Sequence, residues 1–169
     1  MFESKDIPEG KRTKLDLYVT AKEAYEMWKA DPLKVKILDV RTPEEYEFVG
    51  HPEMALNIPL LFMTHRWDST KNQRVFVPNS NFTTAVKSHY SSADIILATC
   101  RSGGRSAAAV NAMTAHGFNN AYSIVDGMEG DLDKDPTSPH CGKRSKNGWK
   151  NSGAPWTYEV RKELLWIKE

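Results

Sequence analysis

The chain has 169 residues, of which 40% are hydrophobic, 10% aromatic and 27% charged, and its 23 basic and 22 acidic side chains give a formal charge of +1. This composition is that of a folded protein of one domain, and it excludes collagen, fibrous proteins and disordered chains. A net charge close to zero also argues against a general affinity for nucleic acid or for anionic membranes.

Two capping boxes open the predicted helices in the first part of the chain. Thr20 to Glu23 precedes apolar residues spaced along one helical face, which predicts a helix that ends near Asp31. Thr42 to Glu45, with proline at the first helical position, predicts a short helix that ends before Gly50. Residues 35–40 between them are apolar and β-branched, so they predict a buried strand.

The middle of the chain is less regular. Residues 55–58 predict a second short strand, which Pro59 ends. Residues 60–78 predict a long irregular loop with His65 and Trp67 in it. Because long loops in compact domains often carry function, we expect these two side chains to be candidates for the entrance of a site.

The second part of the chain repeats the alternation of helix and strand. A helix begins after Asn79 or Ser80 and runs to about Tyr90, and residues 94–99 form the most apolar strand candidate of the chain. An alanine-rich helix over residues 106–116 follows, and then a strand over residues 121–125.

Alternating apolar strands and helices of about ten residues predict an α/β fold. We expect one mostly parallel central sheet with helices on both faces, and a reactive crevice at the carboxyl ends of the strands. Residues 1–14 and 126–155 are rich in residues that break regular structure. We therefore predict an N-terminal extension over 1–14, one domain over 15–158 and a C-terminal helical tail over 159–169, which packs on the sheet or on another chain.

No part of the sequence has the pattern of a targeting or membrane segment. The first 14 residues alternate charges without an apolar stretch, and no apolar run approaches the roughly 20 residues of a membrane helix. We expect a cytoplasmic protein; a mature periplasmic protein whose leader has been removed would have the same sequence.

The residues that carry chemistry lie between the most apolar strand and the helix after it. This cysteine loop, Cys100 to Arg105, begins with a thiol, has two adjacent glycines and includes two arginines. Glycines let backbone N–H groups converge on one point as an anion-binding nest. The arginines and the positive end of the following helix also favour the thiolate, so we predict a reactive Cys100.

The alternative is a purely structural role, in which Cys100 is a small buried hydrophobic residue at the end of a strand. An inert core cysteine gains nothing from two arginines or from a Gly-Gly bend beside it. We therefore favour the reactive cysteine.

Over residues 18–158 the chain resembles the compact, single-domain form of the rhodanese sulfurtransferases. The matching motifs are Leu38-Asp39-Val40-Arg41, Pro43-Glu44-Glu45-Tyr46, Gly50-His51, Asn57-Ile58-Pro59, the cysteine loop with Ser106, and Gly148-Trp149-Lys150-Asn151 with Pro155-Trp156. The resemblance implies an α/β rhodanese-like domain whose cysteine becomes a persulfide, and an arginine at the end of the loop that holds its shape and charge. One departure is Met128-Glu129, where many members have Gly-Trp.

The predicted activity is that of a thiosulfate sulfurtransferase. Cys100 attacks a sulfane sulfur, holds it as a persulfide and yields it to cyanide, to a small thiol or to a protein thiol. Arg105 is the second candidate catalytic residue, and the candidate substrate-binding residues are Arg101, Ser102, Gly103 and Gly104. Arg101 would bind the sulfonate end of thiosulfate, and the loop amides would stabilise the anionic persulfide. The chemistry needs no metal and no organic cofactor.

Two other functions use the same residues. Cysteine phosphatases and arsenate reductases also place cysteine and arginine around an anion-binding loop, but their loops have five residues between the two, whereas four separate Cys100 from Arg105. A rhodanese-like interaction module or a sulfur carrier would differ from an enzyme in performing no repeated turnover.

Other polar residues are expected to be structural. Asp39 and Arg41, at the end of a strand, predict an ion pair near the cysteine loop, and His51 predicts a hydrogen-bonded structural histidine. Cys141 could resolve the persulfide as a disulfide if its segment folds back, although a surface thiol without a role is the simpler hypothesis. The basic run from Lys143 to Lys146 is expected to be a solvated loop, and no zinc-ligand spacing occurs.

Overall fold

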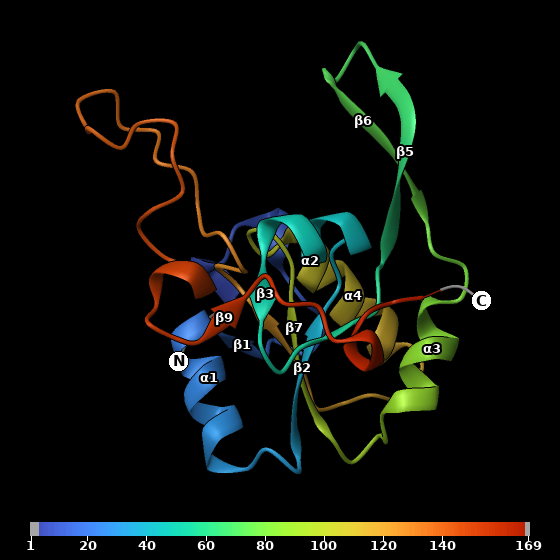
Figure 1. The fold of residues 1–169 in the computed structure, drawn as a ribbon. Helices are drawn as coiled ribbons and strands as arrows, with labels where there is room; N and C mark the ends of the chain where they lie inside the picture. Colours follow the sequence, from blue (N-terminus) through green and yellow to red (C-terminus); the bar gives the residue numbers. More distant parts are fainter. Residues whose placement is uncertain (1–3, 168–169) are drawn as a thin grey trace.

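The computed structural model describes residues 4–167 and contains one central sheet of five parallel strands (Figure 1). Their order is β1 (Tyr18–Val19), β8 (Ala121–Ile124), β7 (Ile95–Thr99), β2 (Val35–Asp39) and β4 (Leu56–Asn57). The two central strands pair from Val35 with Ile95 to Asp39 with Thr99. The predicted α/β fold with a parallel sheet is confirmed.

Helices cover both faces of this sheet, as predicted. The helices α1 (Ala21–Ala30) and α2 (Pro43–Val49) pack on one face, and α3 (Phe82–His89) and α4 (Gly104–Thr114) pack on the other. In Figure 1, α1 and α3 lie on opposite sides of the sheet. Both predicted capping boxes are present, at Thr20 with Glu23 and at Thr42 with Glu45, and they fix where α1 and α2 begin.

Most of the core lies in two large apolar clusters, one on each face, and a third, small cluster consists of Ile7, Tyr18 and Val125. Successive residues of a strand point to opposite faces, so Leu38 and Ile96 join the cluster under α3 and α4, while Ile37 and Leu97 join the cluster under α1 and α2. All four side chains are buried. The central strands are therefore apolar on both faces over most of their length, as expected for a parallel sheet covered on both sides.

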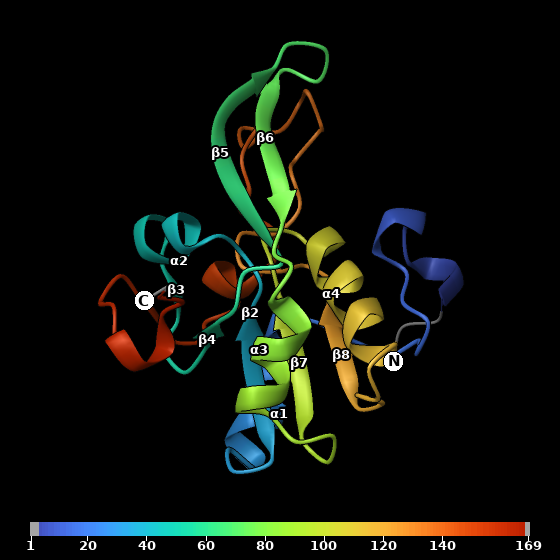
Figure 2. The same ribbon diagram turned by 90° about the vertical axis from the view of Figure 1, so that its right-hand side faces the viewer.

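The prediction of an irregular loop at residues 60–78 is wrong. This segment is an antiparallel hairpin of β5 (Leu61–Asp68) and β6 (Gln73–Pro78), which projects from the edge where the parallel strands end (Figures 1 and 2). The carboxylate of Asp68 accepts hydrogen bonds from the Thr70 amide at 3.0 Å and the Lys71 amide at 3.2 Å. Asn72 adopts a φ of 50°. Aspartate and asparagine thus close the turn that joins the two strands.

The prediction of a helix in the C-terminal tail is also wrong. Of the segment from 159 onward, the structure describes residues up to 167, and these contain only the 3-10 turn η4 (Lys162–Leu164). A short isolated helix gains little from its own hydrogen bonds. The extended chain instead lets Leu165 and Trp166 pack against the two core clusters.

Short elements complete the fold. The strand β3 (His51–Pro52) pairs antiparallel with β9 (Trp156–Thr157), and the 3-10 turns are η1 (Ser4–Asp6), η2 (Glu9–Lys11) and η3 (Trp149–Asn151). Residues 1–3 and 168–169 of the two predicted terminal segments lie outside the described residues. Within residues 4–167, no helix has the length and apolar character needed to cross a bilayer.

Candidate active site

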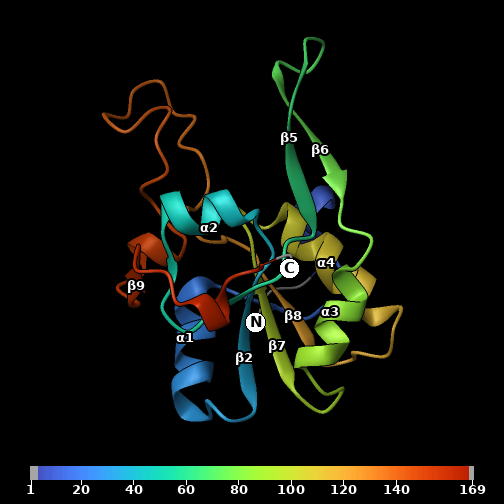
Figure 3. The same ribbon diagram turned by 45° about the vertical axis from the view of Figure 1, so that its right-hand side comes forward.

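Cys100 lies directly after the central strand β7, at the carboxyl edge of the sheet, and two segments project from this edge. Those segments are the β5–β6 hairpin and residues 131–147 (Figures 1 and 3). The Cys100 side chain is 2% exposed and borders the cluster under α3 and α4. Its Sγ atom accepts a hydrogen bond from the Gly103 N–H at 3.1 Å.

The Gly-Gly bend of the cysteine loop depends on Gly103. Gly103 has a φ of +102° and is the N-cap of α4, which begins at Gly104 and not at the predicted Ser106. Gly104 does not need a positive φ. Within the described structure, the Gly103 amide is the one loop amide that bonds Sγ, where we had expected several to converge. The start of α4 beside this amide still places the positive end of an 11-residue helix at the loop.

The segment after β8 supports the cysteine loop from behind, which we did not predict. The Met128 N–H donates to the Cys100 carbonyl at 2.7 Å, and the Glu129 N–H donates to the Arg101 carbonyl at 2.9 Å. Gly127 has a φ of +63°, and a Cβ there would lie 2.6 Å from the Cys100 carbonyl oxygen. Met128 and Glu129, the departure from the family pattern, thus bond the backbone of the loop.

Arg105 forms hydrogen bonds with the helix on the other face, and it also interacts electrostatically with Cys100. Its two terminal nitrogens each lie 2.6 Å from a carboxylate oxygen of Glu45, and its guanidinium lies 6.0 Å from the ring centre of Phe76. Glu45 also completes the capping box of α2. One carboxylate therefore holds the end of the cysteine loop, a role that its capping position alone did not indicate.

This contact changes the acidity of Glu45. Burial opposes ionisation, but the hydrogen bonds and charge of Arg105 outweigh it, and the pKa of Glu45 falls below its ordinary value of 4.5. A carboxyl group with a lowered pKa stabilises the fold above its ordinary pKa, and this contribution is lost as the pH falls through the lowered value.

We therefore expect Glu45→Gln to lower the free energy of unfolding by about 1.5–3 kcal/mol at pH 7, the range for hydrogen bonds to charged groups. The deficit should stay constant down to about pH 5 and shrink below the ordinary pKa of 4.5, as Glu45 is protonated in the original protein. Urea denaturation at several pH values measures this difference. A deficit that does not vary with pH would contradict the ion pair as its cause.

Several other residues of the cysteine loop are open to solvent. The Arg101 side chain is 53% exposed, and its Nε lies 3.1 Å from a carboxylate oxygen of Glu129. Ser102 is half-buried and Gly104 is exposed. Arg101 thus faces the surface beside the thiol, where it borders a cavity formed with the segment around residue 143.

The predicted ion pair of Asp39 and Arg41 is present and fully buried. Arg41 Nη2 lies 2.6 Å from Asp39 Oδ2 and also donates to the Gly50 carbonyl at 2.8 Å. Val40, between the two residues of the pair, donates its N–H to the Thr99 carbonyl beside Cys100. The pair therefore joins the end of β2 to the end of α2, directly beside the cysteine loop.

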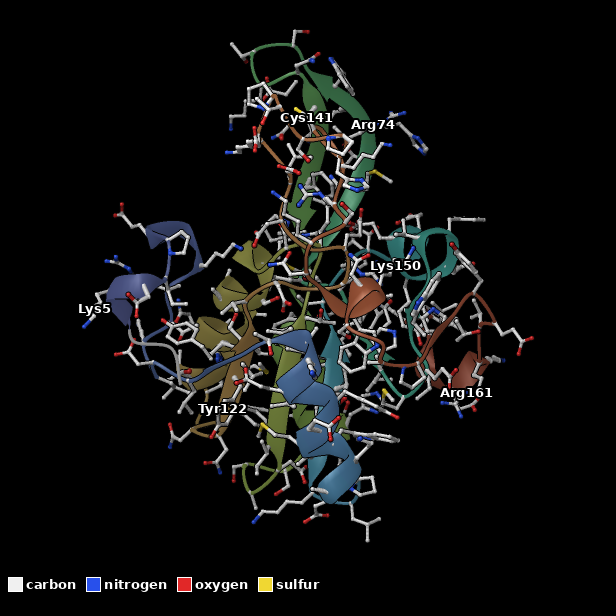
Figure 4. All side chains as sticks on the ribbon, turned by 90° about the vertical axis from the view of Figure 1, so that its left-hand side faces the viewer. Lys5, Arg74, Tyr122, Cys141, Lys150 and Arg161 are labelled. Atoms are coloured by element: carbon white, nitrogen blue, oxygen red, sulfur yellow. The ribbon has the colours of Figure 1, made fainter. Side chains whose placement is uncertain are left out.

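The histidines and the second cysteine lie apart from the thiol. His51 stacks on Tyr46 with ring centres 3.6 Å apart, and burial lowers its pKa, which favours a neutral structural ring. His65 and Trp67 are exposed on the hairpin. Cys141 is exposed toward the outer end of the projecting segment 131–147, whereas Lys150 lies near the base of that segment (Figure 4). Among residues 4–167, no three His, Cys, Asp or Glu side chains group in a way that would hold a metal ion.

The sequence also matches known proteins. A family model described as the rhodanese-like domain matches residues 20–133. An uncharacterized protein of Rickettsia rickettsii is 32% identical over 122 residues, which make up 72% of this chain and 82% of that protein. An Arabidopsis thaliana protein named "Thiosulfate sulfurtransferase 16, chloroplastic" is 37% identical over 92 residues, which make up 54% of this chain and 69% of that protein.

Two solved structures share the fold. The crystal structure of Rv0390 from M. tuberculosis is 27% identical with a TM-score of 0.65, over 83% of this chain and 96% of the other. The solution structure of a rhodanese-like domain from Anabaena is 15% identical with a TM-score of 0.55, over 90% and 92% of the two chains.

Proposed function

Because the chain belongs to the rhodanese-like domain family, we propose that it is a sulfurtransferase that works through a persulfide on Cys100. The observation that carries this proposal is the hydrogen bond from the Gly103 N–H to Cys100 Sγ, in a loop between a central strand and the start of a helix. A backbone N–H and a helix N-terminus both stabilise negative charge on sulfur. The Arabidopsis relative named as a thiosulfate sulfurtransferase supports the same chemistry.

In the first half-reaction, the Cys100 thiolate attacks the outer sulfur of thiosulfate. A bond forms between Sγ and that sulfur, the S–S bond of thiosulfate breaks, and its electron pair leaves with sulfite. The terminal sulfur of the persulfide keeps the negative charge that the thiolate brought. The Gly103 amide and the start of α4 offset that charge, as an oxyanion hole does for oxygen.

In the second half-reaction, an acceptor takes the sulfur. The terminal sulfur first gains a proton from water, and then cyanide or a thiolate attacks it. The bond from that sulfur to Sγ breaks, and its electron pair restores the Cys100 thiolate. Arg105 acts here as a positioning residue, because Glu45 binds its terminal nitrogens and so holds the end of the loop.

The competing functions remain distinguishable by experiment. The four-residue spacing between Cys100 and Arg105 and the single amide on Sγ suit one sulfur atom better than a tetrahedral oxyanion. A carrier would load sulfur as an enzyme does but would not turn over.

Incubation with thiosulfate followed by intact-mass measurement tests the proposal. The Cys141→Ser protein should gain one sulfur atom, and the Cys100→Ser protein should gain none, because only the buried loop thiol lies beside a stabilising amide. Thiocyanate release on addition of cyanide should then continue over many turnovers. Loading without turnover would favour the carrier, and hydrolysis of an aryl phosphate without loading would favour the phosphatase.

A further inference from the structure

A basic cavity of about 400 Å³ opens beside the cysteine loop. Its charged and polar lining comes from the cysteine loop, the turn after β8, the projecting segment and the 3-10 turn η3: Arg101, Glu129, Lys143, Arg144, Lys150 and Asn151. Its volume falls within the roughly 300–1,000 Å³ of small-molecule sites. Arg101, the residue after Cys100 in the chain, lines this cavity, whereas the buried Cys100 side chain does not.

The charges of this cavity are not balanced. Four basic side chains face one carboxylate, that of Glu129, which already lies 3.1 Å from Arg101. In the described part of the chain, the Lys143 ammonium has no hydrogen bond or ion pair. The Lys150 ammonium lies 4.4 Å from the ring centre of Trp156, with no carboxylate partner in the described chain.

Arg144 adds an unsatisfied donor to the same cavity. One terminal nitrogen of its guanidinium donates to the Gly130 carbonyl. Its Nε is buried, and within residues 4–167 it has no hydrogen-bond partner. A buried donor without an acceptor is unfavourable. A ligand whose anionic or carbonyl oxygen accepts a hydrogen bond from this Nε would therefore be stabilised.

The acidic residues of the projecting segment form their hydrogen bonds and ion pairs with other groups. Asp131 pairs with Lys11 at 2.8 Å, and Asp133 pairs with Lys146 at 2.9 Å. Asp135 accepts hydrogen bonds from the amide and hydroxyl of Thr137. Asp131 also interacts electrostatically with Arg144, but among the described residues it forms no ion pair with a cation of the cavity. The cavity therefore keeps more positive than negative charge.

We propose that this cavity binds the carboxylates of the sulfur acceptor, which is a thiol carrying at least two carboxylates. The inference rests on the proposed persulfide chemistry and names the class of its second substrate. Lys143, Arg144 and Lys150 bind the carboxylates, while the thiol of the same molecule extends past Arg101 to the sulfur held on Cys100. Glu129 orients Arg101 at the boundary between the two.

The transfer step itself is unchanged by this assignment. The acceptor thiolate forms a bond to the protonated terminal sulfur, and the bond from that sulfur to Cys100 Sγ breaks. The electron pair of the broken bond restores the Cys100 thiolate, and the acceptor leaves as a persulfide. No oxidant or reductant is needed.

A series of acceptors of increasing charge tests the proposal: 2-mercaptoethanol, 3-mercaptopropionate and mercaptosuccinate, with none, one and two carboxylates. Thiosulfate-loaded Cys141→Ser protein is mixed with each thiol, and kcat/KM is expressed per thiolate present. We expect kcat/KM to rise along the series and to rise less at high ionic strength, because salt screens the attraction. Equal values for the three thiols would overturn the proposal.

Variants then locate the effect in this cavity. In a Lys143→Gln, Lys150→Gln double variant, the ratio of kcat/KM for mercaptosuccinate to that for 2-mercaptoethanol should fall by at least about tenfold, since the loss of even one of the two charged contacts is worth about that factor. Lys134→Gln is the matched control, because Lys134 is an exposed lysine of the same projecting segment outside the cavity. A ratio that stays constant in the double variant, or falls equally in the control, would contradict the assignment.

Binding of succinate separates this proposal from the proposed function. Succinate carries the two carboxylates but no thiol, and its binding to Cys100→Ser protein can be followed by calorimetry or by NMR shifts of residues 142–151. We expect binding to Cys100→Ser protein that is lost in the double variant on the same background. Absence of binding overturns the cavity assignment even where sulfur loads normally. Binding without sulfur loading would instead refute the persulfide chemistry, and with it the cavity's assignment to an acceptor.

Discussion

Replacing Asp39 by alanine is expected to lower the free energy of unfolding by about 3–5 kcal/mol, the usual cost of removing one partner of a buried ion pair. Both side chains of the pair are fully buried, and Arg41 Nη2 lies 2.6 Å from Asp39 Oδ2. The variant leaves the guanidinium in the core without a counter-charge. Urea denaturation followed by circular dichroism measures the loss.

Two comparisons make this result specific. Glu26→Ala removes the exposed pair of Glu26 with Lys29, which is 2.8 Å long, and should have a far smaller effect because water screens both charges. Asp39→Leu with Arg41→Met removes both charges at once and should be less destabilising than Asp39→Ala alone. An Asp39→Ala protein as stable as the Glu26→Ala protein would show that the buried pair does not hold these elements together.

Gly103→Ala is expected to slow sulfur loading on Cys100 by about 10- to 150-fold, the equivalent of one hydrogen bond to a charged group. Gly103 has a φ of +102°, and an added Cβ would lie 2.3 Å from the Val125 carbonyl oxygen. The loop has to move to relieve this contact, and the Gly103 N–H then leaves its position 3.1 Å from Sγ. The rate of mass gain with thiosulfate measures the effect.

Gly117→Ala is the matched control for this variant. Gly117 also has a positive φ, of +93°, but nothing lies within 4 Å of the added Cβ. Alanine at this position introduces the same kind of backbone strain at the far end of α4. The Gly117→Ala protein should therefore be less stable but load sulfur on Cys100 at the original rate. Equal loading rates in Gly103→Ala and in the original protein, with the fold intact by circular dichroism, would show that this amide does not stabilise the sulfur.

Local patterns were sufficient to predict most of the regular structure. The capping boxes at Thr20 and Thr42 identify the starts of α1 and α2 because the bonds that make them span three residues. The apolar run of β7 predicts a buried central strand for the same local reason. The β5–β6 hairpin was missed because its signal lies in the pairing of two strands across the Asp68 turn, and not in either strand alone.

The position of the candidate nucleophile was determined by the sequence itself, because the end of β7, the thiol, Gly103 and the start of α4 are contiguous. Only the tertiary structure decided its surroundings: Glu45 against Arg105, Gly127 against the Cys100 carbonyl, and the basic cavity between Arg101 and Lys143. The physical reason is the parallel sheet. Its crossovers bring the carboxyl ends of strands that are distant in sequence to one edge, so the residues that meet there share no local pattern.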